Sequence, residues 1–213
     1  VSVAAADFNG DGKLDLAVAN QDDNTVSVLL KNGVSTFATK VDYAVGQEPR
    51  SVAAADLNGD GKADLAVTNY GSDTVRVLLN NGDGTFAPKK DYPTGTKPSS
   101  VVAADLDGDG NNDLALTTQE GVVRVLLRTS FGFFAQGTDY ATGSLPERVV
   151  AVDLNGDSKP DLAVTNSSDQ TVSVFLNNGN GTFADRIDYA AGDTPYSLAA
   201  ADLNGDRKND LVV

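Results

Sequence analysis

The nine residues DLNGDGKAD, at positions 56–64, recur almost unchanged at four other places in this chain of 213 residues. The other copies are DFNGDGKLD at 7–15, DLDGDGNND at 105–113, DLNGDSKPD at 153–161 and DLNGDRKND at 202–210. Successive copies begin 49, 49, 48 and 49 residues apart. A fixed period of this length is typical of repeat proteins, so we expect one structural unit to recur along the chain.

Each nine-residue loop carries side-chain oxygens at its positions 1, 3, 5 and 9. A tight turn can direct the first three toward one centre, with the carbonyl of position 7 beside them and the carboxylate of position 9 closing the shell. Oxygen ligands without sulfur or imidazole favour Ca²⁺ over zinc or copper, and Mg²⁺ requires a stricter octahedron. We therefore predict up to five calcium sites. Their ligands are Asp7, Asn9, Asp11, Lys13 and Asp15; Asp56, Asn58, Asp60, Lys62 and Asp64; Asp105, Asp107, Asp109, Asn111 and Asp113; Asp153, Asn155, Asp157, Lys159 and Asp161; and Asp202, Asn204, Asp206, Lys208 and Asp210, where Lys13, Lys62, Asn111, Lys159 and Lys208 contribute a backbone carbonyl.

The loops differ at the positions that need an unusual backbone. Glycine stands at position 4 of every copy and at position 6 of the first three, as a sharp turn with positive φ requires. Ser158 and Arg207 replace it in the last two copies, where we expect left-handed strain if the turn is kept. Asp107 adds a fourth carboxylate to the third loop. We therefore expect the third site to be the tightest and the last two to be the weakest.

Solvated turns are the alternative interpretation, because Asp, Asn and Gly are ordinary turn residues. The charge distribution supports the metal interpretation: the net charge is −14, and 16 of the 30 acidic residues lie in the five loops. Five divalent ions would bring the net charge to about −4, so most of the acidity is ligand charge. No basic patch indicates nucleic acid, and no apolar run indicates membrane insertion of this segment.

Between the loops, the sequence predicts strands. Short apolar and β-branched runs such as ADLAVTN (63–69) and TVRVLLN (74–80) are bounded by Gly, Asn and Asp, and no stretch has a helical period. Four short strands per unit of about 49 residues predict an all-β fold, a β-propeller of four-stranded antiparallel blades. We expect recurring bulky residues such as Leu78, Phe86 and Tyr92 to pack between blades rather than to bind a ligand.

We predict a single repeat domain over residues 1–213, with four complete repeats and the first half of a fifth. The repeats span about 1–49, 50–98, 99–146, 147–195 and, as the partial repeat, 196–213. Three arrangements agree with this count: a fragment of a larger ring, an imperfect five-bladed ring, and a subunit completed by a neighbouring chain.

The loops are followed by DLAV, DLAL or DLVV, and the turns NNGDGTF (80–86) and NNGNGTF (177–183) follow later in two repeats. These motifs resemble the FG-GAP/VCBS repeat family, whose calcium-loop repeats also form the propellers of integrin α-subunits. The resemblance covers essentially the whole chain. It implies a β-propeller in which the cation loop joins the first and second strands of each blade, and it implies no catalytic residues.

Catalysis has little support in the composition. The chain has no His and no Cys, which excludes Ser-His-Asp and Cys-His arrangements, and it has only three Glu. Four Asp residues outside the loops each precede a Tyr at the same repeat position, which indicates a structural role: Asp42, Asp91, Asp139 and Asp188. We therefore do not expect an enzyme.

We expect a calcium-stabilised extracellular module for binding or adhesion, secreted or at the cell surface, whose partner is a protein or glycan of the cell surface or matrix. One alternative is a structural subunit that self-associates into polymers or fibres through its incomplete blade. Another is a carbohydrate-binding lectin, or an accessory module of a larger secreted enzyme.

Individual specificity is expected where the repeats differ. RTSFGFF (128–134) replaces the usual turn of the third repeat and places Phe131 and Phe133 in a hairpin. Exposed aromatic side chains suit a partner contact or sugar stacking, and the alternative is that they fold back on the neighbouring blade. Tyr70 and Tyr196 have no counterparts in the other repeats and are further candidates.

Overall fold

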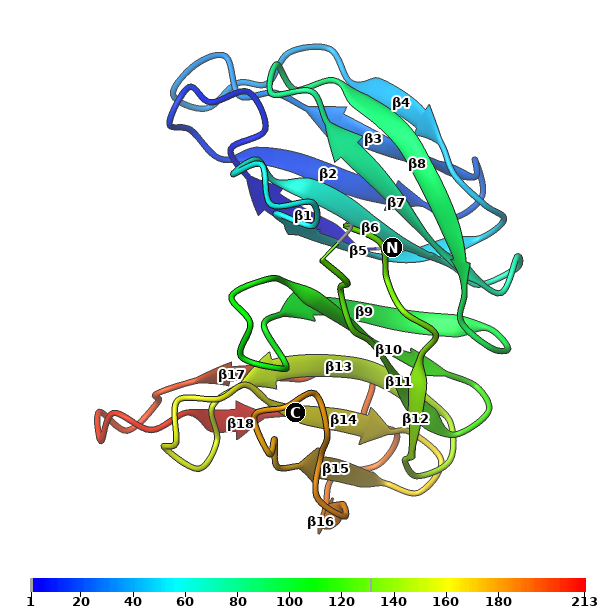
Figure 1. The fold of residues 1–213 in the computed structure, drawn as a ribbon, viewed down its shortest axis with the longest axis vertical. Helices are drawn as coiled ribbons and strands as arrows, with labels where there is room; N and C mark the ends of the chain where they lie inside the picture. Colours follow the sequence, from blue (N-terminus) through cyan, green and yellow to red (C-terminus); the bar gives the residue numbers. More distant parts are fainter. Residues whose placement is uncertain (1, 131) are drawn as a thin grey trace. The chain divides into compact units, whose positions relative to one another are not determined.

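The computed structural model describes residues 2–130 and 132–213, with the side chains of Pro88 and Lys89 left undescribed. These residues form 18 β-strands and no helix (Figure 1). The strands make four antiparallel sheets of four strands and one sheet of two strands. The fold class is therefore all-β, with four complete blades and the first half of a fifth, as the repeat count predicts. Nowhere in the described chain is there a helix suited in length and hydropathy to crossing a bilayer.

Each sheet uses consecutive strands of one repeat. The first contains β1 (Val3–Ala6), β2 (Asp15–Asn20), β3 (Thr25–Leu29) and β4 (Val41–Ala44), and the second β5 (Pro49–Ala55), β6 (Asp64–Asn69), β7 (Thr74–Asn80) and β8 (Phe86–Pro93). The third contains β9 (Pro98–Ala104), β10 (Asp113–Thr118), β11 (Val122–Leu126) and β12 (Thr138–Ala141), and the fourth β13 (Pro146–Val152), β14 (Asp161–Asn166), β15 (Thr171–Phe175) and β16 (Ile187–Ala190). The two-stranded sheet pairs β17 (Ala199–Ala201) with β18 (Asp210–Val212).

The nine-residue loops join the first and second strands of every sheet. The loop at 7–15 connects β1 to β2, and the loop at 202–210 connects β17 to β18. The second strand of each complete sheet lies between two partners, and in β6, β10 and β14 every residue is buried. In the second, third and fourth blades the loop is therefore attached to the most buried strand of its own blade.

The chain forms two compact units. The first comprises Val1–Val101 with Ser130–Phe133, and the second comprises Val102–Thr129 with Phe134–Val213. Each unit has its own apolar core, which contains contacts between consecutive sheets. The boundary between the units falls within β9, and the short segment 130–133 belongs to the first unit although it follows β11 in the chain.

Aromatic residues pack between the sheets within each unit. In the first, Phe86 is 6 % exposed and lies edge-on to Phe8 and Tyr43, with ring centroids 5.4 and 5.5 Å apart. In the second unit, Tyr140 and Phe183 make the corresponding contact at 5.3 Å. Such aromatic pairs contribute about 0.5–1.5 kcal/mol beyond the area they bury. The prediction that the recurring bulky residues pack between blades is confirmed for these residues.

Candidate metal centres

The first aspartate of each loop organises the turn through its backbone amides. Asp7 accepts hydrogen bonds from Gly10 N–H at Oδ1 and from Gly12 N–H at Oδ2, both at 2.8 Å. The first aspartates of the other loops accept the same pair of N–H groups, at positions 4 and 6, with distances from 2.6 to 2.9 Å. These hydrogen bonds favour the ionised carboxylate and so lower its pKa. The largest contribution comes from the Gly12 N–H for Asp7 and from the Ser158 N–H for Asp153.

Positions 3 and 5 of each loop continue this pattern. The side-chain oxygen of position 3 accepts the N–H of position 5, and the position-5 carboxylate accepts the N–H of position 7. In the second loop, for example, Asn58 Oδ1 accepts the Asp60 N–H, and Asp60 Oδ1 accepts the Lys62 N–H. In the first, second and fourth loops the position-7 lysine also pairs with that carboxylate, at 2.8 Å from Lys13 Nζ to Asp11 Oδ2 in the first. Because such exposed ion pairs contribute little to stability, a lysine of this kind is displaced from the carboxylate at small cost.

Position 6 has a left-handed backbone in all five loops. Gly12, Gly61 and Gly110 have φ between 80° and 83°, and both Ser158 and Arg207 have φ of 67°. The expectation of left-handed strain in the fourth and fifth loops is therefore confirmed. A side chain at such a φ costs roughly 1–2 kcal/mol relative to the right-handed region.

We expect Ser158→Gly and Arg207→Gly each to stabilise the fold by about 0.5–1 kcal/mol, since relief of strain exceeds the extra entropy of glycine in the unfolded chain. Thermal unfolding of the single variants and the double variant measures the gain. The matched control is Gly12→Ala, at φ of 80° with nothing within 4 Å of the added Cβ, which should destabilise through backbone strain alone. Unchanged stability in all of these variants would contradict the strain argument.

The aspartate at position 9 has a second role that sequence reasoning missed. Asp15, Asp64, Asp113 and Asp161 are completely buried. In Asp64, Oδ2 accepts the Leu57 N–H at 3.0 Å and Oδ1 accepts the Asn80 N–H at 2.8 Å. The carboxylate therefore ties the start of the loop to the end of the third strand.

The same two hydrogen bonds recur in every complete blade. The donors at the end of the third strand are Lys31, Asn80, Arg128 and Asn177, at 2.6 to 2.8 Å. Burial is the main reason why the pKa of Asp64 and the pKa of Asp113 are both raised to about 6. The sequence signal for this role was the apolar strand that directly follows the position-9 aspartate.

Asparagine at the end of the third strand adds a further link in two blades. Asn80 Nδ2 donates to Phe8 O at 3.0 Å and to Ala63 O at 2.9 Å, and its Oδ1 accepts the Gly82 N–H. Asn177 makes the same bonds to Leu106 O and Pro160 O. The first asparagine of the NNG turn therefore joins one cation loop to the loop of the preceding blade.

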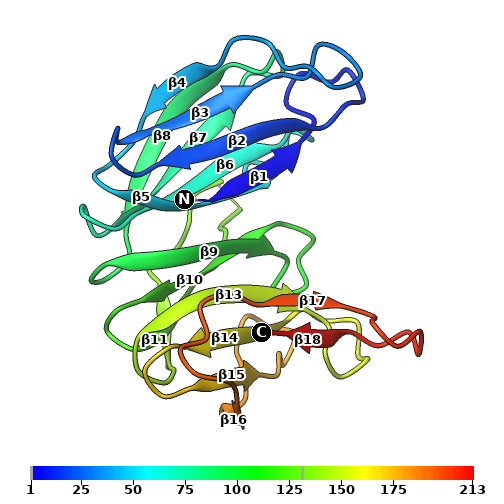
Figure 2. The same ribbon diagram turned by 180° about the vertical axis from the view of Figure 1, so that it is seen from behind.

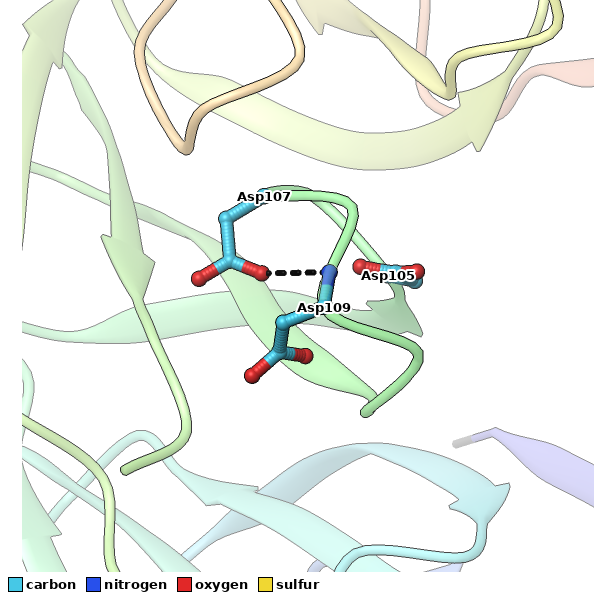
Figure 3. Close-up of side chains that lie close together, drawn as sticks. All are labelled: Asp105, Asp107 and Asp109. Carbon is cyan, nitrogen blue, oxygen red and sulfur yellow. Dashed lines mark hydrogen bonds between the residues drawn. The ribbon is translucent and has the colours of Figure 1, made fainter. Parts of the chain in front are cut away.

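The third loop brings three carboxylates together. Ligand oxygens of Asp105, Asp107 and Asp109 all lie within 4.8 Å of one another (Figure 3). Oxygens bound to calcium at about 2.3–2.6 Å have separations of this size. Burial and the neighbouring carboxylates of Asp109 and Asp105 raise the pKa of Asp107. This cluster suits a hard cation, which would remove the repulsion.

Asp113 does not belong to that three-carboxylate cluster. Its two oxygens instead accept the N–H groups of Leu106 and Arg128, at 2.9 and 2.6 Å. Each oxygen keeps a second lone pair, so a position-9 ligand would have to share its carboxylate between the ion and the backbone.

Two of the non-repeating aromatic residues have cationic neighbours in the first unit. Phe133 is 45 % exposed, and Lys90 Nζ lies 5.6 Å from the centre of its ring. The guanidinium of Arg50 lies 3.4 Å above the ring of Tyr70. Tyr196 is 68 % exposed, while Phe131 lies outside the described residues. Phe133 therefore contacts a neighbouring blade and still presents part of its surface to solvent.

Comparison with known proteins agrees with the repeat geometry. The model of the FG-GAP-like repeat matches residues 7–67, 56–116, 105–164 and 153–213, which together span nearly the whole chain. The chain belongs to the FG-GAP repeat family. Each match of the FG-GAP-like repeat runs from one cation loop through the second strand of the next blade. No curated protein matches the sequence.

Solved structures share the β-propeller-like fold at low sequence identity. A crystal structure of BBS1N in complex with ARL6DN has a TM-score of 0.66 at 14 % identity, over 92 % of this chain and 58 % of that one. The hydrazine synthase of Kuenenia stuttgartiensis has a TM-score of 0.63 at 16 % identity, over 93 % of this chain and 51 % of that one. The Tc holotoxin pore of Photorhabdus luminescens has a TM-score of 0.52 at 22 % identity, over 99 % of this chain and 10 % of that one. The FG-GAP repeat chain thus spans less than two thirds of these proteins.

Proposed function

We propose that this FG-GAP repeat chain is a calcium-stabilised, non-catalytic binding or adhesion module that works outside the cell. The observation that carries the proposal is the convergence of the Asp105, Asp107 and Asp109 carboxylates in the third of five similar loops. Two unit charges about 4 Å apart repel by roughly 4 kcal/mol at an effective dielectric of 20, so an ion among them has a large electrostatic role.

Calcium in these loops would act on the fold. The same loop that offers oxygens to the ion is tied by Asp64 or its counterparts to the third strand of its blade. An ion that orders the loop therefore orders the hairpin to which it is attached. Up to five calcium ions are proposed, and modest affinities of about 10⁻⁴–10⁻³ M match the calcium concentration outside cells. The proposed location is accordingly secreted or at the cell surface.

The repeated aspartates outside the loops make structural contacts, which supports a non-catalytic module. Asp91 pairs with Arg76 at 2.6 Å and Asp139 pairs with Arg124 at 2.5 Å. Asp42 and Asp188 accept hydrogen bonds from Ser27 and Ser173. These carboxylates link the third and fourth strands of their blades, as the sequence interpretation expects. The proposed partner is a protein or glycan of the cell surface or matrix.

Calorimetric titration with calcium tests the proposal. We expect saturable binding in which Asp109→Ala removes the tightest component, because that loop holds the carboxylate cluster. The matched control, Asp206→Ala in the fifth loop with its strained Arg207, should remove a weaker component. Equal effects of the two variants would refute the ranking of the sites, and no heat of binding by the wild-type chain would refute the calcium proposal.

A further inference from the structure

Two asparagine side chains, Asn80 in the first unit and Asn177 in the second, each hold carbonyl groups of two cation loops at once. Asn80 Nδ2 donates one hydrogen bond to Phe8 O at 3.0 Å and another to Ala63 O at 2.9 Å. Phe8 is position 2 of the first loop, and Ala63 is position 8 of the second. A single amide group therefore fixes a peptide unit in each of two consecutive loops.

The two carbonyls lie between candidate ligands. Phe8 stands between positions 1 and 3 of the first loop, and Ala63 stands between positions 7 and 9 of the second. The backbone N–H of Asn80 also donates to Asp64 Oδ1, the position-9 carboxylate, at 2.8 Å. A shift of Asn80 would therefore move the backbone beside ligand oxygens in both loops.

The side chain of Asn80 is held in one orientation. It is buried, and its Oδ1 accepts the Gly82 N–H at 2.7 Å. Both donors of Nδ2 and the oxygen are thus engaged, and the bond from Gly82 determines which end of the amide faces the carbonyls. Loss of either carbonyl contact would leave a buried polar group without a partner, which is unfavourable.

Apolar packing connects the same two blades. The side chain of Phe8 is buried and lies edge-on to Phe86, which follows the turn that Asn80 begins. The first strands of the two sheets, β1 and β5, lie side by side (Figure 2). The first loop is therefore attached to the second blade through its backbone and through a side chain.

The second unit repeats this arrangement. Asn177 Nδ2 donates to Leu106 O in the third loop at 3.0 Å and to Pro160 O in the fourth loop at 2.9 Å. Its Oδ1 accepts the Gly179 N–H at 2.7 Å. The side chain of Leu106 is buried in the same apolar cluster as Phe183. The link is therefore built in the same way in both units.

Cationic residues occupy the corresponding position in the first and third blades, as Lys31 and Arg128. Neither side chain has an acceptor atom, so neither can accept the N–H two residues further on, as Asn80 and Asn177 do. Within residues 2–130 and 132–213, the asparagine link therefore occurs once in each unit. It joins the first loop to the second and the third loop to the fourth.

We propose that Asn80 and Asn177 couple the cation sites within each unit, so that calcium binds cooperatively to the first and second loops and to the third and fourth. The inference rests on the proposed calcium binding and adds how the sites influence one another. Order in one loop holds the shared amide in place, so the other loop has less conformational entropy to lose. Repulsion between two ions acts in the opposite direction and is screened by salt.

NMR spectroscopy of the whole chain follows the loops separately, through the Gly12 N–H in the first and the Gly61 N–H in the second. Each donates to the first aspartate of its loop, so its resonance should shift when calcium is added. At about 0.15 M salt, we expect Asp60→Ala, which disables the second site, to raise the calcium concentration at the Gly12 midpoint about fivefold. An unchanged midpoint would overturn the coupling while calcium binding stands. No calcium-dependent shift in the wild-type chain would refute the proposed function, and the coupling with it.

The variant Asn80→Ser tests the link without a change of charge. A serine hydroxyl can still accept the N–H two residues further on and so keep the turn, but it is too short to reach the carbonyls of Phe8 and Ala63. In this background, Asp60→Ala should change the Gly12 midpoint by less than about twofold. A fivefold effect that persisted in Asn80→Ser would assign the coupling to another route and contradict the proposal.

The next asparagine of the same turn provides the matched control. Asn81 is exposed, and its side chain donates to Thr85 Oγ1 at 2.9 Å within the turn. Asn81→Ser should therefore leave the fivefold effect of Asp60→Ala intact. Loss of the effect in this variant as well would show that Asn80 has no specific part in the coupling.

The second unit offers an independent test, which also covers the case in which Asn80→Ser does not fold. Asp157→Ala disables the fourth site, and the Gly110 N–H, which donates to Asp105 Oδ2 at 2.9 Å, follows the third. We expect Asp157→Ala to weaken calcium binding at the third site about fivefold, and less than about twofold in the Asn177→Ser background. Equal effects in the two backgrounds would rule out the asparagine link as the cause.

Discussion

The Asp64→Asn variant is expected to lose about 1–3 kcal/mol of folding free energy at about pH 5 in the absence of divalent ions, where the buried side chain, with its pKa raised to about 6, is largely uncharged in the folded state. The Asp64 carboxylate is buried and accepts the N–H groups of Leu57 and Asn80 at 3.0 and 2.8 Å. An amide of the same shape has one acceptor oxygen, so its NH₂ group must face one of these donors. The variant thus leaves a buried N–H unsatisfied between the loop and the third strand.

Urea unfolding with a chelator present measures this effect without any contribution from calcium. The matched control is Asp60→Asn, which removes a charge at an exposed position of the same loop and should cost less than about 1 kcal/mol under these conditions. If the two variants lost the same stability, the carboxylate at position 9 would have no special structural role.

Removal of calcium is expected to have the largest effect on the whole chain. At about 10 mM calcium, a site with a dissociation constant of roughly 10⁻⁴–10⁻³ M adds about 1.4–2.7 kcal/mol of stability. Five such sites would contribute about 7–14 kcal/mol, which is similar to the entire stability of a typical domain. We expect a chelator to lower the melting temperature by more than about 15 °C, as followed by circular dichroism.

The pH dependence of the calcium-free chain is a control for this interpretation. Burial raises the pKa of Asp64 and that of Asp113 to about 6, while the unfolded chain has an aspartate pKa of about 3.9. The folded state therefore binds more protons between these values, and stability falls as the pH rises from about 4 to 6. With a chelator, the melting temperature should be higher at about pH 5 than at about pH 7.

Calcium should abolish or reverse this trend, because the ion binds the ionised carboxylates. Carboxylates whose pKa is lowered, such as Asp7 and Asp153, lose their contribution only as the pH falls through their folded pKa, below the window considered. A calcium-free chain whose melting temperature rises steadily toward neutral pH would contradict the assignment of the raised pKa values.

The repeat period and the position of the loops could be predicted from the sequence because both depend on local signals. The Gly and Asx residues fix the turn, and the apolar runs on either side fix the strands between which each loop lies. The left-handed backbone of Ser158 and Arg207 followed from alignment of the five copies, because the turn needs the same φ whichever residue occupies position 6. The packing of Phe86 and Phe183 between blades also followed from their regular recurrence.

The roles that sequence reasoning missed depend on residues distant in the chain. The hydrogen bond from Asn177 Nδ2 to Leu106 O spans 71 positions, and nothing in either local sequence indicates it. The Asp64 carboxylate is likewise a ligand candidate by its spacing, but its bond to Asn80 depends on the pairing of the second and third strands.

The most direct test of the account is a crystal structure of the chain grown in calcium, with the ions located by their anomalous scattering. We expect an ion in the third loop at about 2.3–2.6 Å from oxygens of Asp105, Asp107 and Asp109, and from the carbonyl of Asn111. The first two loops should hold ions in the same way, and the fourth and fifth should be less fully occupied. Loops that keep their shape in saturating calcium with only water among the carboxylates would show that they are not calcium sites.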